Sequence, residues 1–178
     1  IFLNSLVAGC LGILGWLSVE QFRDGRPTTF GAASGVVAGL VAITPSCGTV
    51  NTLGAAVVGL AAGIVCSFAI GLKFRFGYDD SLDVVGVHFV GGVVGVLLIG
   101  FLATAVMTGG PNGLLYGGGL LQLGKQALGM VVVALYAFAV LTLFLAASYT
   151  GVAMLARVTP ALFPGRSLNN VGVVALLD

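Results

Sequence analysis

The stretch DDSLDVVGVHFVGGVVGVLLIGFLATAVM, from Asp79 to Met107, joins a short acidic start to a long apolar run. It contains three of the six acidic residues of the chain and its single histidine, His88. A helix of about 20 apolar residues crosses a bilayer core about 30 Å thick. The stretch therefore predicts a transmembrane helix from about Leu82 to Met107, with carboxylates at its start and an imidazole within the membrane.

The composition places the whole chain in a membrane. Of its 178 residues, 58% are hydrophobic and only 7% are charged, and the mean hydropathy is +1.15. A soluble domain carries about 25% charged residues, so a protein this poor in charge is not expected to stay dispersed in water. The net charge of +1 comes without a basic stripe, which gives no indication of a nucleic-acid partner. The three cysteines stand singly without metal-site spacing, and no cofactor is indicated.

Apolar runs of the required length recur along the chain and predict an all-α, polytopic membrane protein. Helices satisfy their own backbone hydrogen bonds in lipid, whereas open sheet edges do not. Residues 1–156 form the predicted transmembrane region and residues 157–178 the predicted tail. The five predicted spans are Ile1 to about Phe22, about Phe30 to Gly48, about Leu53 to Leu72, about Leu82 to Met107, and about Ala127 to Leu155.

The basic residues predict the direction of these spans, because positively charged loops stay on the cytoplasmic side of a membrane. The loops after the second and fourth spans carry only Lys125. The loops after the first and third spans, and the tail, are more basic and are predicted to be cytoplasmic. The chain is therefore placed in the plasma membrane with its C-terminus inside. The basic residues of the predicted cytoplasmic segments are Arg23, Arg26, Lys73, Arg75, Arg157 and Arg166.

The second span ends irregularly, in the sequence AITPSCGTVN from Ala42 to Asn51. Pro45 cannot donate the helical hydrogen bond that the carbonyl of Val41 would accept. Two interpretations are open. The break is simply the end of a helix, or the freed carbonyls and the Thr44 hydroxyl face a water-filled or substrate cavity.

The acidic residues at the start of the fourth span predict a helix N-terminus. Asp79 and Asp80 precede the span and Asp83 falls in its first turn, where carboxylates cap open backbone N–H groups. Asp80 and Asp83 stand three residues apart, the spacing of a capping arrangement. Capping is the favoured role for Asp79 and Asp80. For Asp83 a second role stays open, in which its carboxylate fixes the end of a neighbouring helix.

His88 is predicted to lie inside the hydrocarbon zone, five residues or about 7.5 Å beyond Asp83. Helical spacing puts Val84 and the glycines at 91, 92 and 95 on its face, which predicts that neighbouring helices bury the imidazole. Polar groups in a membrane usually line a pathway, so we favour a functional role over an inter-helix hydrogen bond. Apolar surroundings favour the uncharged imidazole, which has one donor and one acceptor nitrogen for a small substrate.

No chemistry beyond this is indicated around His88. No second histidine or cysteine stands at ligand spacing, so a metal site is not expected. Asp83 and His88 are five residues apart and face different ways, and no catalytic triad or carboxylate pair is visible. The chain is therefore not expected to be an enzyme.

Three stretches in this order resemble the ammonium transporter (Amt/MEP/Rh) family: LNSLVAGCLGILGW, ASGVVAGLVAITPSCGTV and DDSLDVVGVHFVGGVVG. The resemblance covers about residues 1–145 and includes the predicted orientation. It implies that the spans are the last five of eleven transmembrane helices, an incomplete second repeat of two inverted repeats. It also implies a homotrimer with a narrow pore through each subunit, and transport of ammonium or ammonia across the lipid bilayer.

The same resemblance assigns roles to individual residues. His88 is similar to the second histidine of the pair that lines the middle of the pore, and Val84 to a residue of its inner part. Ser34, Val37 and Thr44 resemble further pore-side residues. Asp83 resembles a structural acid of the pore helix. The glycines that resemble contacts between pore helices are Gly91, Gly92 and Gly95.

The resemblance also indicates what a chain of this extent lacks. The first histidine, the outer cation site and the phenylalanine gate belong to helices outside it. The chain ends RVTPALFPGRSLNNVGVVALLD instead of the usual acidic stretch, which puts regulation by a PII-class signalling protein in doubt. We therefore expect a partial ammonium transporter. The alternatives are an Rh-type gas channel, or a membrane fragment with a sensor or structural role and no transport of its own.

Overall fold

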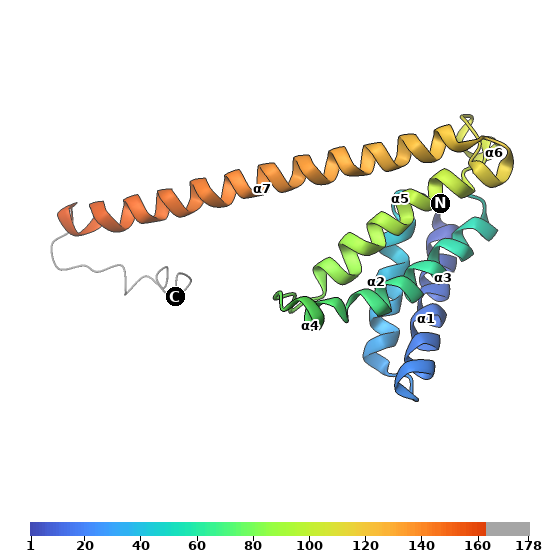
Figure 1. The fold of residues 1–178 in the computed structure, drawn as a ribbon, viewed down its shortest axis with the longest axis horizontal. Coiled ribbons are helices and arrows are strands. Elements are labelled where there is room, and N and C mark those ends of the chain that lie inside the picture. The colour runs from blue at the N-terminus through green and yellow to red at the C-terminus, as the bar shows by residue number, and fades with distance from the viewer. Residues whose placement is uncertain (163–178) are drawn as a thin grey trace. The chain divides into compact units, whose positions relative to one another are not determined.

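A computed structural model describes residues 1–162, and every regular element in that range is helical, which confirms the all-α prediction. Two compact units are present, Ile1–Met130 and the residues from Val131 onward. The elements, drawn in Figure 1, are α1 (Phe2–Asp24), α2 (Thr29–Ile43), α3 (Thr52–Ala69), α4 (Leu72–Phe76), the π-helix η1 (Val84–Phe89), α5 (Val90–Leu102), α6 (Ala105–Thr108), the 3-10 helix η2 (Leu114–Tyr116) and α7 (Leu120–Leu162).

Four segments of the described chain are long and apolar enough to cross a membrane, and they mark a membrane protein. The prediction of five full-length spans is wrong at the second. That span, predicted to reach Gly48, is the 15-residue helix α2, which is about 22 Å long. It stops at Ile43 because turns occupy residues 44–49, around Pro45. The four long segments are Phe2–Asp24, Thr52–Phe76, Val84–Leu102 and Leu120–Met154.

Local sequence explains where the helices of the first unit begin. The Thr28 hydroxyl accepts a hydrogen bond from the backbone N–H of Gly31 at 2.8 Å and caps α2. The Asn51 side chain does the same for the N–H of Gly54 at 2.8 Å and caps α3. These caps replace hydrogen bonds that the first turn of a helix cannot make within itself.

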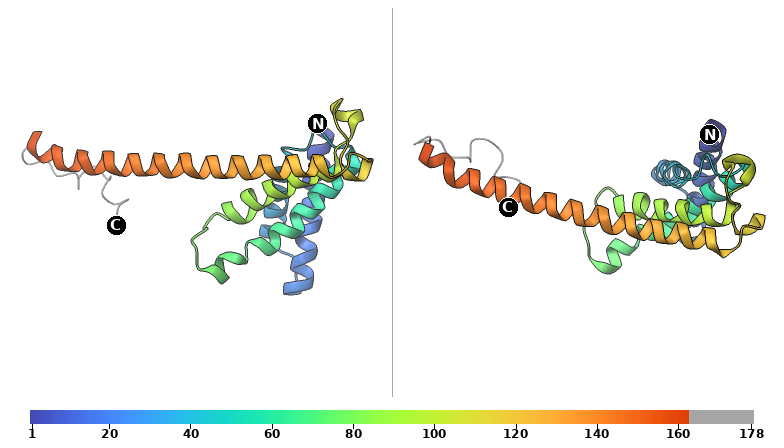
Figure 2. Two further views of the ribbon diagram at one scale, coloured as in Figure 1. Left: turned by 45° about the horizontal axis from the view of Figure 1, so that its top comes forward. Right: turned by 90° about the horizontal axis from the view of Figure 1, so that it is seen from above.

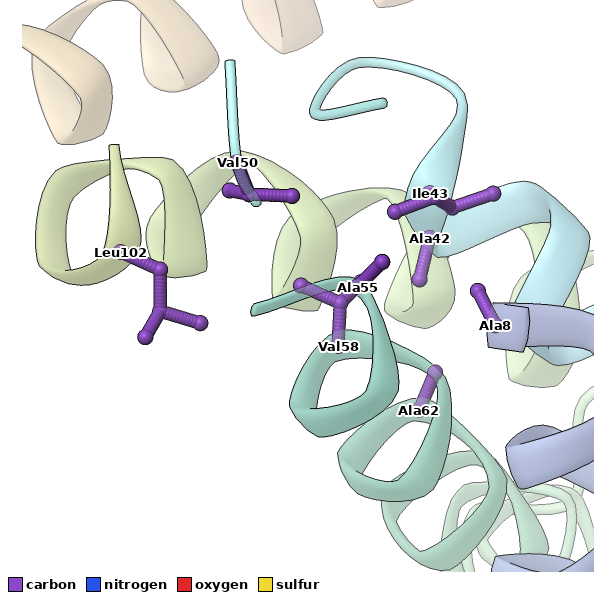
Figure 3. Close-up of a cluster of buried hydrophobic side chains, with 8 residues drawn as sticks. All are labelled: Ala8, Ala42, Ile43, Val50, Ala55, Val58, Ala62 and Leu102. Carbon is purple, nitrogen blue, oxygen red and sulfur yellow. The ribbon is translucent and has the colours of Figure 1, made fainter. Parts of the chain in front are cut away.

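Helices α1, α2 and α3 pack side by side, as Figures 1 and 2 show, and glycine and alanine form their closest contacts. A Cβ atom added at Gly12 would collide with the carbonyl of Gly35 on α2, and one at Gly59 would collide with that of Ala8 on α1. Small residues allow such close backbone approach inside a membrane. Figure 3 shows the main buried cluster, which consists of Ala8, Ala42, Ile43, Val50, Ala55, Val58, Ala62 and Leu102.

Helix α5 packs on α2 and α3 and completes the first unit. The fourth span is shorter at both ends than predicted. It starts with the π-helical turn at Val84, and α5 ends at Leu102, because residues 103 and 104 are extended and α6 is a separate short helix.

The second unit consists, as far as it is described, of the helix from Val131 to Leu162. The predicted fifth span lies inside α7, a 43-residue helix that begins earlier and ends later than predicted. Almost every side chain from Val131 to Met154 is exposed, and most are apolar, which suits contact with lipid. The predicted tail begins at residue 157, but the helix continues to Leu162, and the tail from residue 163 lies outside the described residues.

Candidate functional site

His88 is carried by a π-helical turn, Val84–Phe89, rather than by an α-helix. Such turns are rare and occur often at functional sites. The turn starts from Asp83, which has φ 54° and ψ 32° and is the one non-glycine residue of positive φ among the described residues. Aspartate tolerates this left-handed conformation better than most residues. The backbone N–H of Val87 donates to the Asp83 carbonyl at 2.7 Å and closes the first turn.

Asp80 caps this turn. Its side chain is buried, and one carboxylate oxygen accepts the backbone N–H groups of Val85 at 3.0 Å and Gly86 at 3.2 Å. The predicted capping role of Asp80 is confirmed. The same prediction is wrong for Asp79, because its carboxylate accepts the hydroxyl of Ser81 at 2.7 Å and is exposed.

The surroundings of Asp80 act on its acidity in opposite directions. Burial raises the pKa of the carboxyl, while hydrogen bonds from the N–H groups of Gly86, Val85 and Val84 and the positive charge of Lys73 lower it. The net result is a pKa below its ordinary value of 3.8. Asp80 is therefore a carboxylate at neutral pH, the state that the turn needs as an acceptor.

Asp83 has the second role that its sequence position left open. Its carboxylate pairs with the Lys73 ammonium group at 2.6 Å, and the two side chains are only 18% and 19% exposed. Lys73 also donates to the carbonyl of Asp80 at 3.0 Å. Asp83 thus fixes the end of a neighbouring helix, α4, to the start of the histidine turn.

The His88 side chain is exposed in the described chain, so its burial by neighbouring helices stays a prediction for the longer protein. The buried line of this helix runs through Val87, Gly91, Gly95 and Ile99, one residue in every four. His88 comes one residue after Val87 and is therefore turned away from that buried line. Nearly all residues in this helix are apolar, so no polar face in the sequence distinguishes position 87 from position 88.

The three glycines after His88 do not share one environment. A Cβ at Gly95 would collide with the carbonyl of Ala42, and one at Gly91 would lie 3.3 Å from a methyl of Val41. These two glycines are contacts between helices, as predicted. At Gly92 an added Cβ would meet nothing within 4 Å among the described residues, so its predicted helix contact stays a prediction.

The contacts of these glycines also indicate which part of α2 lies at the same height along the helix axis as His88. Gly91 lies beside Ala38 and Val41, and Gly95 lies beside Ala42, so α2 and α5 run in the same direction. His88, about one turn before Gly91, is therefore level with the α2 residues preceding Ala38.

Ser34 and Val37 lie on one face of α2 together with Val41, because the three are spaced three and four residues apart. Thr44, the C-cap residue just after α2, continues this face three residues beyond Val41. Ser34 is half-buried, Val37 is 40% exposed and Thr44 is exposed. The structure brings Ser34 and Val37 to the level of His88. Thr44 lies about 10 Å further along the axis than Val37. Val84, on the histidine turn itself, is 52% exposed.

The break after α2 is a helix end rather than a set of free carbonyls. The Thr44 hydroxyl donates to the carbonyl of Leu40 at 2.7 Å, and the Thr44 N–H donates to that of Val41 at 3.3 Å. The side-chain amide of Asn4 donates to the carbonyls of Cys47 and Val50, each at 2.9 Å. Sequence reasoning missed Asn4, although it is a buried amide inside an apolar span, which is an unusual place for one.

Comparisons with known proteins address the family of the chain. The model of the Ammonium Transporter Family matches residues 1–161. The chain belongs to the ammonium transporter family. This confirms the resemblance found in the sequence, and the family is one of transporters rather than enzymes.

Relatives of this ammonium transporter family chain are considerably longer. An ammonium transporter of Mycobacterium bovis is 55% identical over 151 residues, which cover 82% of this chain and 31% of the relative. The crystal structure of the Mep2 mutant delta442 from Candida albicans matches with a TM-score of 0.75 and 36% identity, covering 82% of this chain and 38% of that one. A structure described as a sensor Amt protein matches with a TM-score of 0.69 and 31% identity, covering 80% and 34%. The chain thus spans about a third of the length of such relatives.

Proposed function

We propose that this chain forms one wall of a transmembrane pathway for ammonium or ammonia, in which His88 binds the substrate. One observation carries the proposal. The His88 imidazole is exposed on the surface of the first unit, and it belongs to a segment long and apolar enough to cross a membrane. A polar group in this position is costly unless water, substrate or further protein faces it. Val84 lies on the same turn, and Ser34 and Val37 lie at about its level on α2.

The remaining part of the longer protein covers this face in our proposal. Substrate sites of many transporters form at the interface between two repeats, so one repeat alone presents its half of the site as an open surface. The open position at Gly92, one turn beyond His88, is consistent with a helix packing there. This chain would be an incomplete second repeat, and Thr44 would lie further along the same path.

The chemistry of the pathway follows from the cost of moving a charge through hydrocarbon, which is several times the thermal energy. Ammonium would release a proton before entering, and neutral ammonia would cross the apolar path. An uncharged imidazole can accept a hydrogen bond from ammonia at one ring nitrogen and donate one to its lone pair from the other. His88 would therefore hold ammonia without needing a counter-charge.

A chimera tests the proposal. Residues 1–161 of this chain would replace the corresponding segment of the mycobacterial relative, and uptake of labelled methylammonium would be measured in cells lacking their own transporters. We expect uptake by the chimera and its loss in His88→Leu at equal expression. Cys10→Ser, an exposed position on α1, serves as the matched control and is expected to leave uptake unchanged. Undiminished uptake in His88→Leu would contradict a substrate role.

Assembly and location belong to the same proposal. The protein would be a homotrimer in the plasma membrane with its C-terminus in the cytoplasm, as family resemblance and the basic residues of its loops suggest. Cross-linking in membranes tests the trimer, and reporter fusions to successive loops test the orientation. A role for a PII-class regulator would show as co-purification with the longer protein.

A sensor is the second candidate function, and the similarity to the sensor Amt protein favours it. A sensor would bind ammonium without moving it across the membrane. The chimera experiment separates the two candidates, because saturable methylammonium uptake is expected only of a transporter.

A further inference from the structure

Packing attaches the middle of the histidine turn to the first unit, through Gly86 against Ile70 and Val87 in a buried cluster, whereas charged groups attach its start. Lys73, in the short helix α4, reaches across the loop to the Asp83 carboxylate at 2.6 Å and to the Asp80 carbonyl at 3.0 Å. We propose that Lys73 is a positioning residue for His88, because it holds the left-handed Asp83 from which the π-helical turn with the imidazole starts. The inference concerns the geometry of His88, and its functional meaning rests on the pathway proposed above.

The backbone of Asp83 explains why such a hold is needed. A non-glycine residue at φ 54° is in a sparsely populated region that persists only where its surroundings fix it. Two backbone hydrogen bonds contribute, from the Asp83 N–H to the Asp80 carbonyl at 3.1 Å and from the Val87 N–H to the Asp83 carbonyl at 2.7 Å. The Lys73 ammonium group binds both ends of the chain turn from Asp80 to Asp83. It donates to the Asp80 carbonyl and to the Asp83 carboxylate.

The environment of the pair strengthens it. Both side chains are about four-fifths covered, so solvent screens them less than it would an exposed pair. The Lys73 ammonium group also lies 5.4 Å from the centre of the Phe74 ring, within the range of a cation–π contact. Among the described residues the one other salt bridge, Arg23–Asp24, joins two residues adjacent in the sequence that are more exposed, at 42% and 47%.

The other attachments of the turn act elsewhere and do not replace Lys73. Asp80 holds the N–H groups of Val85 and Gly86. The Cys66 thiol, buried on α3, donates to the Val87 carbonyl at 3.7 Å. Both fix the middle of the turn. Without Lys73, the carboxylate of Asp83 would remain largely covered with no cation beside it, which is unfavourable. The first residue of the turn would then be free to leave the left-handed conformation.

A single-histidine protein allows a direct test. The 178-residue chain contains one histidine, so histidine-selective ¹⁵N labelling of the chain in lipid nanodiscs gives the signals of one imidazole. We expect Lys73→Gln to shift the two ring-nitrogen signals of His88 or to broaden them beyond detection, while far-ultraviolet circular dichroism shows unchanged helix content. Lys125→Gln is the matched control, because Lys125 is the only other lysine. It is expected to leave the signals in place.

Two further variants keep the test decisive. Lys73→Arg retains the charge and is expected to restore the signals of the unmodified chain. Asp83→Asn keeps a side chain that tolerates the left-handed region but removes the pair, so it should reproduce the shift of Lys73→Gln. Adding Lys73→Gln to Asp83→Asn should then shift the signals no further, as expected of two partners in one contact. Signals of Lys73→Gln that coincide with those of the unmodified chain would overturn the proposal.

This experiment is independent of transport. If the imidazole signals move in Lys73→Gln but His88→Leu leaves chimera uptake unchanged, the positioning proposal stands and the substrate role of His88 fails. If the signals stay in place while His88→Leu abolishes uptake, the substrate role stands and Lys73 is not a positioning residue.

Discussion

An alanine at Gly95 should weaken the packing of α5 on α2, whereas an alanine at Gly92 should not. A Cβ added at Gly95 would lie 2.8 Å from the carbonyl carbon and 3.0 Å from the Cα of Ala42, and would collide with the carbonyl oxygen. Carbon atoms in contact settle about 3.5–4.0 Å apart. The two helices must therefore separate by about 1 Å in Gly95→Ala, and a gap of that size forfeits between about a quarter and a half of each affected contact.

The magnitude follows from comparing the two variants. Replacing glycine by alanine inside a helix gains about 0.8–1.0 kcal/mol of helix propensity, and this gain is common to both positions. Overpacking costs about 1–3 kcal/mol and arises only at Gly95, because nothing described lies within 4 Å of a Cβ at Gly92. Gly95→Ala should therefore be about 1–3 kcal/mol less stable than Gly92→Ala. Relative to the unmodified chain, Gly92→Ala should be slightly more stable.

The assay uses the single tryptophan of the chain. Trp16 is 2% exposed in the core formed by α1, α2 and α3, so its fluorescence reports unfolding of the first unit. Titrating mixed micelles with a denaturing detergent gives the free energy of unfolding of each variant. A Gly95→Ala chain as stable as Gly92→Ala would refute the close approach of α5 to Ala42.

Three further predictions concern other parts of the first unit. The pKa of Asp80 lies below its ordinary value, so its carboxylate stabilises the histidine turn above about pH 4, and this stabilisation is lost as the pH falls through the lowered pKa. The backbone N–H groups that it caps should therefore lose protection against hydrogen exchange, relative to the intrinsic rate at each pH, at acid pH, and Asp80→Asn should remove that dependence. Asn4→Leu leaves two backbone carbonyls unpaired and should cost about 1–3 kcal/mol in the same unfolding assay, whereas Ser5→Ala, which removes one exposed hydrogen bond to the Ile1 carbonyl, should change the stability little. The 178-residue chain in liposomes should not conduct ammonium, so internal pH after an ammonium pulse should follow that of empty vesicles; faster entry that His88→Leu abolishes would show that the chain is sufficient.

The architecture was predictable where hydropathy decides it. Lipid requires long apolar helices, and four of the five predicted spans correspond to segments of sufficient length. The predicted second span was too long because it was extended to Gly48, although the residues after Ile43, TPSCGT, are mostly small or polar and include Pro45. Hydrogen bonds from Asn4, more than 40 positions away in the chain, stabilise the turns there. A local pattern contains no sign of them.

The sequence indicated which residues form the candidate site, but not which way the His88 side chain points. A histidine inside an apolar helix indicated the site, and the acidic start indicated a capped turn, which Asp80 provides. The direction of His88 depends on whether the turn is α-helical or π-helical and on which neighbour Gly91 contacts. Both are tertiary features, and the apolar sequence on either side of His88 fits either alternative. The pairing of Lys73 with Asp83 joins residues ten positions apart across a loop, where helical spacing rules do not apply.

The π-helical turn has a consequence for how this protein could change over evolutionary time. Its hydrogen bonds join residues five apart instead of four, so the turn contains one residue more than an α-helical turn needs. Deleting one codon between Val84 and Val87 would let the segment continue as an ordinary α-helix, with Gly91 and Gly95 still seated on α2. The deletion would leave the composition almost unchanged but would turn the acidic start of the segment about 100° around the helix, away from Lys73. The geometry around His88 therefore depends on the number of residues in this segment as well as on their identity. Insertions and deletions alter it more directly than substitutions do.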